Sequence, residues 1–130
     1  MPSDNGLLLV APDSGAKLPD HLRLLIGAIS GAALSLSFTG LYLSIYSWIC
    51  VGVLLLAVFG ARGRVAFACG FLHALLFVLT SVPWIATVLS VHGGLPIAGG
   101  WGVLLLIAAA WGVLVGSFTL TVHRISRRSI

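Results

Sequence analysis

The stretch VAFACGFLHALLFVLTSVPWIATVLSV, residues 65–91, decides the fold, because it contains no charged side chain. A helix rises about 1.5 Å per residue and needs roughly 20 apolar residues to cross about 30 Å of hydrocarbon. Residues 65–91 are therefore predicted to cross a membrane as a helix. Pro83 removes one backbone hydrogen bond, so we expect the helix to be kinked or loosened just before Trp84.

Three further apolar runs extend this prediction to the whole chain: residues 22–38, 41–59 and 101–122. The composition agrees, since 59% of the residues are hydrophobic, 8% are charged and the mean hydropathy is +1.15. Soluble domains carry about 25% charged residues. A membrane β-barrel would need alternating strands, whereas these runs are continuously apolar. The sequence thus predicts an all-α membrane protein with four transmembrane helices.

The basic residues predict the orientation of these helices. They are found before or at the start of the first run, between the second and third runs, and after the fourth run: Lys17, Arg23, Arg62, Arg64, Arg124, Arg127 and Arg128. Residues 39–40 and 92–100, which join the other runs, contain no Lys or Arg. Basic loops close to membrane spans stay in the cytoplasm. Both termini are therefore expected in the cytoplasm, and the turn at residues 92–96 outside.

The two ends of the chain are expected to be cytoplasmic tails. Residues 1–21 hold three prolines and the three acidic residues of the chain, which predicts a disordered tail, and residues 123–130 predict a short basic tail. A cleaved signal peptide is the competing interpretation of the N-terminal part, but no small-residue cleavage site is convincing, so the first span is expected to be retained. The net charge of +4 could suggest nucleic-acid binding, but the sequence contains no recognisable nucleic-acid-binding module. Membrane phospholipids are the expected partner instead.

The sequence offers no complete set of residues for catalysis, for a cofactor or for a metal. It contains no glutamate, its one lysine is Lys17, and Cys50 and Cys69 lie inside predicted spans without metal-ligand spacing. His73 lies within a span that has no acidic partner, which favours neutral packing or a hydrogen bond to the backbone over proton-coupled transport.

Small residues four positions apart predict faces on which helices approach closely. The expected packing positions are Gly27, Gly31, Gly70, Ala74, Gly112 and Gly116. Because glycine and alanine are common in membrane helices, the pattern does not indicate which helices pair.

The third and fourth runs also contain a more specific pattern. A basic segment leads to Gly70-Phe71, a tryptophan follows at residue 84, then a Gly-Gly-hydrophobe-Pro turn at residues 93–96, and an Ala-Ala-Trp element at residues 109–111. In this order and spacing, residues 22–122 resemble the N-terminal membrane region of bacterial apolipoprotein N-acyltransferases. Departures from the family pattern include Ala86, where a tyrosine is usual, and Ala74, where a glycine is common.

The resemblance implies a multi-pass protein of the bacterial inner membrane that serves lipoprotein maturation. Members of this family transfer an acyl chain from a phospholipid to an apolipoprotein through a Glu-Lys-Cys triad in a nitrilase-like domain. No triad residue carries over to this sequence. We therefore expect a truncated or split N-terminal portion that is inactive alone, with an apolipoprotein or a separately encoded nitrilase-like domain as its partner.

One feature of the resemblance suggests a site. A kink at Pro83 and a turn at Gly93-Gly94 would let the two helices around the turn splay, with Trp84 at the depth of the lipid headgroups. Lipid or substrate access is thus expected near Trp84, His92, Gly93, Gly94 and Pro96. An ordinary helix hairpin accounts equally for this pattern. The alternative function is a small non-catalytic membrane protein with a structural or accessory role.

Overall fold

The structure is a computed structural model in which residues 18–38 and 44–128 are described. Within these residues the chain is all-α, as predicted, with no strand. Its elements are α1 (Asp20–Leu34), the 3-10 helix η1 (Ser35–Phe38), α2 (Ser44–Val58), α3 (Gly63–Ser81), α4 (Trp84–Val91) and α5 (Ile97–Arg128).

Two of the described helices are long and apolar enough to cross a membrane, over Gly63–Ser81 and Ile97–Ser126. Only 33% and 28% of the residues in their most apolar windows are buried. Large apolar side chains on other helices also face outward, such as Trp48 at 78% exposure. Since a soluble protein rarely exposes so much contiguous apolar surface, lipid is the solvent that this surface fits. The helices α1 and α2 are shorter, with 15 residues each.

Several element boundaries differ from the sequence prediction. Asp20 and His21 belong to α1 and not to the predicted tail, because the helix starts directly after Pro19, its N-cap. Residues 123–128, at the start of the predicted basic tail, continue α5 as helix. Hydropathy ends at Val122, but no glycine or proline follows to stop the helix. Residues 1–17, 39–43 and 129–130 lie outside the described part.

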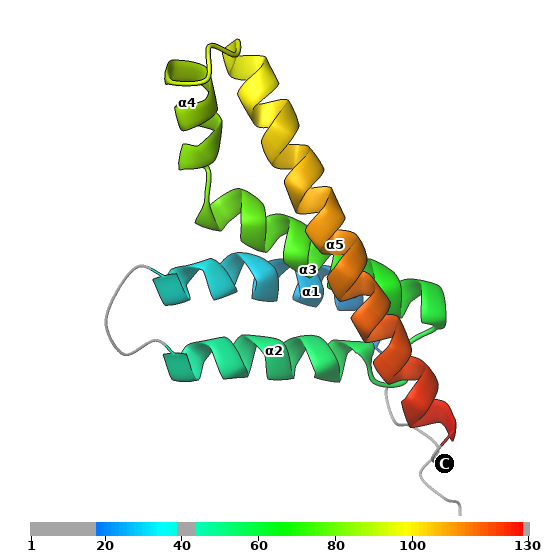
Figure 1. Ribbon diagram of the computed structural model, residues 1–130. Coiled ribbons are helices and arrows are strands. Elements are labelled where there is room, and N and C mark those ends of the chain that lie inside the picture. The colour runs from blue at the N-terminus through cyan, green and yellow to red at the C-terminus, as the bar shows by residue number, and fades with distance from the viewer. Residues whose placement is uncertain (1–17, 39–43, 129–130) are drawn as a thin grey trace, which may run out of the picture.

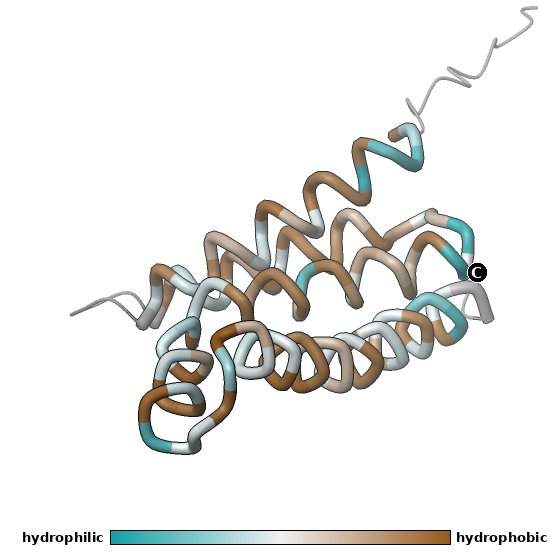
Figure 2. The backbone as a smooth tube through the Cα atoms, turned by 90° about the horizontal axis from the view of Figure 1, so that it is seen from above, coloured by the Kyte–Doolittle hydropathy of each residue, from teal (hydrophilic) through white to brown (hydrophobic). Residues whose placement is uncertain are grey.

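The helices form a layer of three that is crossed by a fourth. Figure 1 shows α1, α2 and α3 side by side, while the long α5 runs diagonally across α3. The short α4 turns away from the end of α3 and leads back to the start of α5. Seen from above in Figure 2, hydrophobic residues occupy the middle of the helices and hydrophilic residues gather toward their ends.

Two apolar clusters form the core. Leu54, Val58, Ala66 and Cys69 join α2 to α3, and Val78, Ala86, Leu104 and Ala108 join α3, α4 and α5. Small side chains predominate in both clusters, so the helix backbones lie close together. The α3 helix takes part in both clusters and is the central helix of the fold.

Candidate functional site

The predicted break at Pro83 is confirmed. Helix α3 ends at Ser81, Val82 adopts φ −129° and ψ 40°, and Pro83 is the N-cap of α4. Because proline has no N–H, the helical hydrogen-bond ladder is interrupted at this point. Trp84 therefore opens a new helix, and 59% of its surface is exposed.

The turn at residues 92–96 joins α4 to α5 and is fully exposed. Gly94 has φ +68°, a left-handed conformation that favours glycine. The Leu95 N–H donates to the carbonyl of Leu89 at 3.3 Å, and the carbonyl of Pro96 accepts from Gly99 at 2.8 Å. The turn is thus a compact connection, with the His92 side chain on the surface.

The structure does not bring the five predicted access residues together. Trp84 starts α4, whereas His92, Gly93, Gly94 and Pro96 follow its other end. A helix of this length separates its two ends by about 10 Å. These residues therefore lie at the two opposite ends of α4 and do not form one pocket.

The expected splay between the two helices around the turn is absent at the turn itself. The backbone of Gly100, near the start of α5, lies against the Ala86 carbonyl and the Ser90 hydroxyl of α4, leaving no room for a Cβ. Ala86 is 1% exposed at this contact. The end of α3 and the start of α5 diverge instead, and α4 connects them (Figure 1).

All six predicted packing positions lie at helix contacts. Gly27 and Gly31 of α1 face the backbone of Cys69 and His73 in α3. The opposite side of α3 meets α5, where Gly112 and Gly116 face Phe71 and Phe67. Gly70 lies against Val115 and Thr119, and Ala74 is 1% exposed.

Buried polar residues strengthen these contacts, and sequence reasoning missed most of them. Thr119 is fully buried and its hydroxyl reaches the Ala66 carbonyl of α3 at 2.8 Å. In the α1–α3 contact, the Nδ1 atom of His73 lies 2.8 Å from the Ser30 hydroxyl. Ser30 donates to the Gly27 carbonyl, so its oxygen can accept a hydrogen bond from the Nδ1–H of His73. For His73, neutral packing or a backbone hydrogen bond was expected, and the structure buries it at 4% exposure beside the Ser30 hydroxyl.

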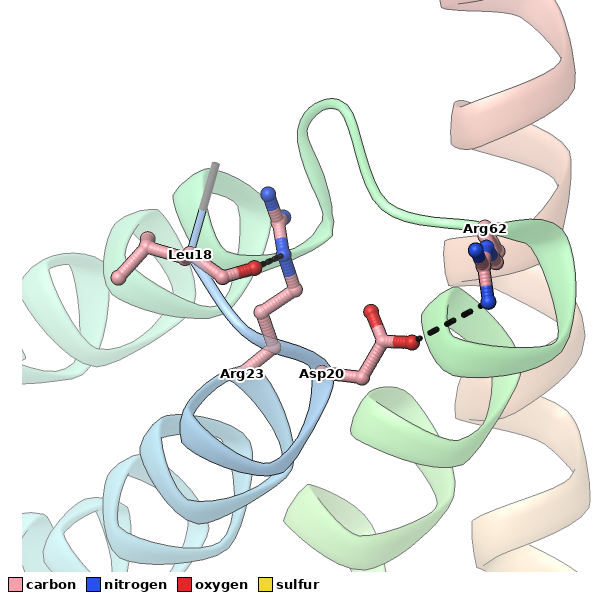
Figure 3. Close-up of polar contacts among 4 residues, drawn as sticks. All are labelled: Leu18, Asp20, Arg23 and Arg62. Carbon is pink, nitrogen blue, oxygen red and sulfur yellow. Dashed lines mark hydrogen bonds and ion pairs between the residues drawn. The ribbon is translucent and has the colours of Figure 1, made fainter. Parts of the chain in front are cut away.

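Arg23 is the least expected of these residues, because it is buried within the first turns of α1 at 6% exposure. Its Nη1 donates to the carbonyls of Ala57 at 2.6 Å and Phe59 at 2.7 Å, at the end of α2. Figure 3 shows its Nε donating to the Leu18 carbonyl at 3.0 Å. A cation at a helix C-terminus satisfies carbonyls that have no partner within the helix. In the sequence, only its position one helix turn after Pro19 could have indicated that Arg23 is buried at a helix end.

Within the described residues, these contacts hold helices together, and no catalytic or metal-binding group of side chains is found among them. The only acidic side chain among them, Asp20, lies 3.8 Å from Nη1 of the exposed Arg62 (Figure 3). Cys50 and Cys69 are free and buried, and no group of three or more His, Cys, Asp or Glu in this part of the chain is placed to hold a metal ion.

Comparison with known proteins gives one match. The family model for the apolipoprotein N-acyltransferase N-terminal domain matches residues 30–130. Neither the curated proteins nor the solved structures gave a match. The matched region includes the last part of α1 and all of α2 to α5, together with the Trp84 and Gly93–Pro96 elements on which the sequence resemblance depends. With more than half of its residues matched, the chain belongs to the apolipoprotein N-acyltransferase family, in which it represents the N-terminal domain.

Proposed function

We propose that this chain is the N-terminal membrane region of an apolipoprotein N-acyltransferase in the bacterial inner membrane. It crosses the membrane four times, with both termini in the cytoplasm, and guides phospholipid toward a catalytic domain. That nitrilase-like domain, which accepts the acyl chain and passes it to an apolipoprotein, lies outside these 130 residues. The observation that carries the proposal is the family match over residues 30–130.

The positions of the helix ends support four crossings. The start of α1 contacts the end of α2 through Arg23, and Gly63 at the start of α3 lies beside His123 near the end of α5. These four helix ends therefore meet at one end of the molecule. Four crossings with both termini on the same side of a membrane require this arrangement. The described arginines Arg23, Arg62, Arg64 and Arg124 all belong to this end, which we call the basic end.

The other end of the molecule suits contact with lipid. The α4 helix exposes Trp84, Val88 and Val91, whereas Ala86 faces α5. A tryptophan at such a helix end is typical of the membrane–water interface. In our proposal α4 forms the outer rim past which lipid tails reach the catalytic domain.

Labelling of single cysteines tests the orientation. After replacement of Cys50 and Cys69 by alanine, His92→Cys should react with a membrane-impermeant maleimide in intact spheroplasts. Arg124→Cys should react only after the membrane is permeabilised. Reaction of both positions from the same side would contradict the proposed topology.

Complementation tests the function. In cells depleted of their own N-acyltransferase, the chain alone should leave lipoproteins without the third acyl chain, as measured by mass spectrometry. Co-expression with the remaining portion of a related enzyme should restore acylation. If the chain is a non-catalytic accessory protein, co-expression should restore no acylation. Acylation by the chain alone would contradict our proposal that a separate nitrilase-like domain carries out catalysis.

A matched pair of tryptophan variants tests the role of α4. In the restored system, Trp84→Ala should raise the phospholipid concentration needed for half-maximal transfer. Trp48→Ala, on α2 and 78% exposed, is the control and should leave it unchanged. Equal effects of both substitutions would show that α4 has no special part in lipid access.

A further inference from the structure

The basic end holds a cavity of about 210 Å³ between the end of α2 and the end of α5. One part of its wall is apolar, formed by Leu55, Phe59 and Val122 among others. The other part is polar and consists of Gly60, His123 and Ser126. The cavity wall is therefore mainly apolar, with the side chains of His123 and Ser126 as its polar groups.

His123 is the most buried polar side chain that lines this cavity. Only 8% of its surface is exposed, and within the described residues its ring makes no hydrogen bond to the protein. A buried imidazole without a hydrogen bond is unfavourable unless a ligand or water supplies one. Because His123 lines the cavity, its ring is available to a molecule bound there.

The start of α3 lies beside this imidazole. A Cβ placed on Gly63 would be 4.0 Å from Nε2 of His123. The first N–H groups of a helix have no acceptor within the helix, and the N-cap residue Arg62 provides no side-chain acceptor for them. Helix N-termini of this kind favour an anion. The His123 ring and the first residue of α3 are thus neighbours at the basic end.

The arginines of the basic end also favour an anion there. Arg62 and Arg64 flank Gly63, and Arg124 follows His123 in the chain. The carbonyls at the end of α2 would repel an anion, but Arg23 donates to two of them. Asp20 is the one carboxylate of the described residues at this end, and it lies nearest Arg62.

We infer that this cavity binds one anionic phospholipid. Its phosphate accepts hydrogen bonds from His123 and the start of α3, and one acyl chain lies along Leu55, Phe59 and Val122. The apolar wall favours a lipid over free phosphate, since inorganic phosphate would leave that wall uncovered. In the proposed topology this site faces the cytoplasmic leaflet, opposite the α4 rim, so it is distinct from the route of the acyl donor.

Native mass spectrometry of the purified 130-residue chain tests the inference. The chain is titrated in non-ionic detergent with phosphatidylglycerol or with phosphatidylcholine. We expect one phosphatidylglycerol to be retained per chain at about a tenfold lower concentration than phosphatidylcholine. His123→Ala should weaken retention of phosphatidylglycerol at least about fivefold. His21→Ala is the matched control, because His21 is an exposed histidine at the same end.

Two further variants keep the test decisive if His123→Ala folds poorly. His123→Gln retains an N–H donor and should recover most of the retention. Val122→Trp fills the cavity without changing a polar group and should lower retention of phosphatidylglycerol. Circular dichroism checks that each variant keeps its helices.

Three results would overturn the inference. The first is equal retention of both lipids by the wild-type chain, and the second is unchanged retention in His123→Ala and Val122→Trp. The third is displacement of phosphatidylglycerol by millimolar inorganic phosphate, which would identify a free-phosphate site. Failure of the complementation experiment above would leave this result unaffected, because lipid retention needs no catalytic domain.

Discussion

Gly31→Ala provides the sharpest test of the packing between α1 and α3. An alanine Cβ at this position would lie 2.7 Å from the Cα of His73 and would overlap the His73 carbonyl. Ordinary contact begins at 3.4 Å, so the two helices must separate by at least roughly 0.7 Å. The distance between His73 Nδ1 and Ser30 Oγ would grow from 2.8 Å to more than about 3.5 Å, beyond a good hydrogen bond.

The expected loss of stability follows from these two effects. Overpacking of a tight contact costs about 1–3 kcal/mol. A hydrogen bond between membrane helices adds about 0.6 kcal/mol on average. We therefore expect Gly31→Ala to lower the free energy of unfolding by about 2–4 kcal/mol.

The assay is unfolding of the purified chain by sodium dodecyl sulfate in mixed micelles, followed by circular dichroism. Gly52→Ala is the control, because nothing lies within 4 Å of a Cβ at Gly52. Alanine also favours a helix over glycine by about 0.5–1 kcal/mol, so this control should unfold at the same or a higher detergent fraction. Equal midpoints for Gly31→Ala and wild type would refute the close α1–α3 contact.

Two other substitutions test the buried polar contacts by the same unfolding assay. Thr119→Val removes the hydrogen bond from α5 to α3 and should cost about 0.6–1.7 kcal/mol, whereas Thr121→Val, exposed and bonded within its own helix, should cost less. A loss in Thr121→Val as large as in Thr119→Val would contradict this. Arg23→Gln leaves carbonyls at the end of α2 without their charged donor and should cost about 2 kcal/mol or more. Arg62→Gln, with a side chain 85% exposed, should stay within about 0.5 kcal/mol of wild type, and similar losses for both arginines would argue against the cap.

The sequence predicts the helical class and the break at Pro83 because both depend on local properties. Hydropathy over about 20 residues finds a membrane helix, and proline cannot continue the hydrogen-bond ladder whatever surrounds it. Helix ends follow a different rule. The α5 helix continues from Val122 to Arg128 because polar residues can extend a helix beyond the apolar stretch.

Helix pairing and the buried polar contacts could not be predicted from the sequence. Gly31 faces His73, and Thr119 bonds the Ala66 carbonyl. Both contacts depend on where α1 and α5 lie on α3, which one sequence does not specify. Small residues show where a helix can be approached, but not by which partner. The same limit applies to His123, which appears as a tail residue in the sequence and becomes part of a cavity only when α5 packs beside α2 and α3.

The strengths of these contacts differ along the molecule, and this difference bears on the lipid access that we propose. Helix α3 is held by α1 through tight glycine contacts and the Ser30–His73 bond, and by α5 through glycines and Thr119. Between α4 and α5, in contrast, no described hydrogen bond joins the two helices, and their close contact is at Gly100. Displacing α4 therefore requires less free energy than separating α3 from α5. Amide hydrogen exchange in lipid nanodiscs should accordingly be faster in α4 than in the middle of α3. Equal protection of the two helices would mean that α4 is fixed, and lipid would then have to pass the outer rim without moving it.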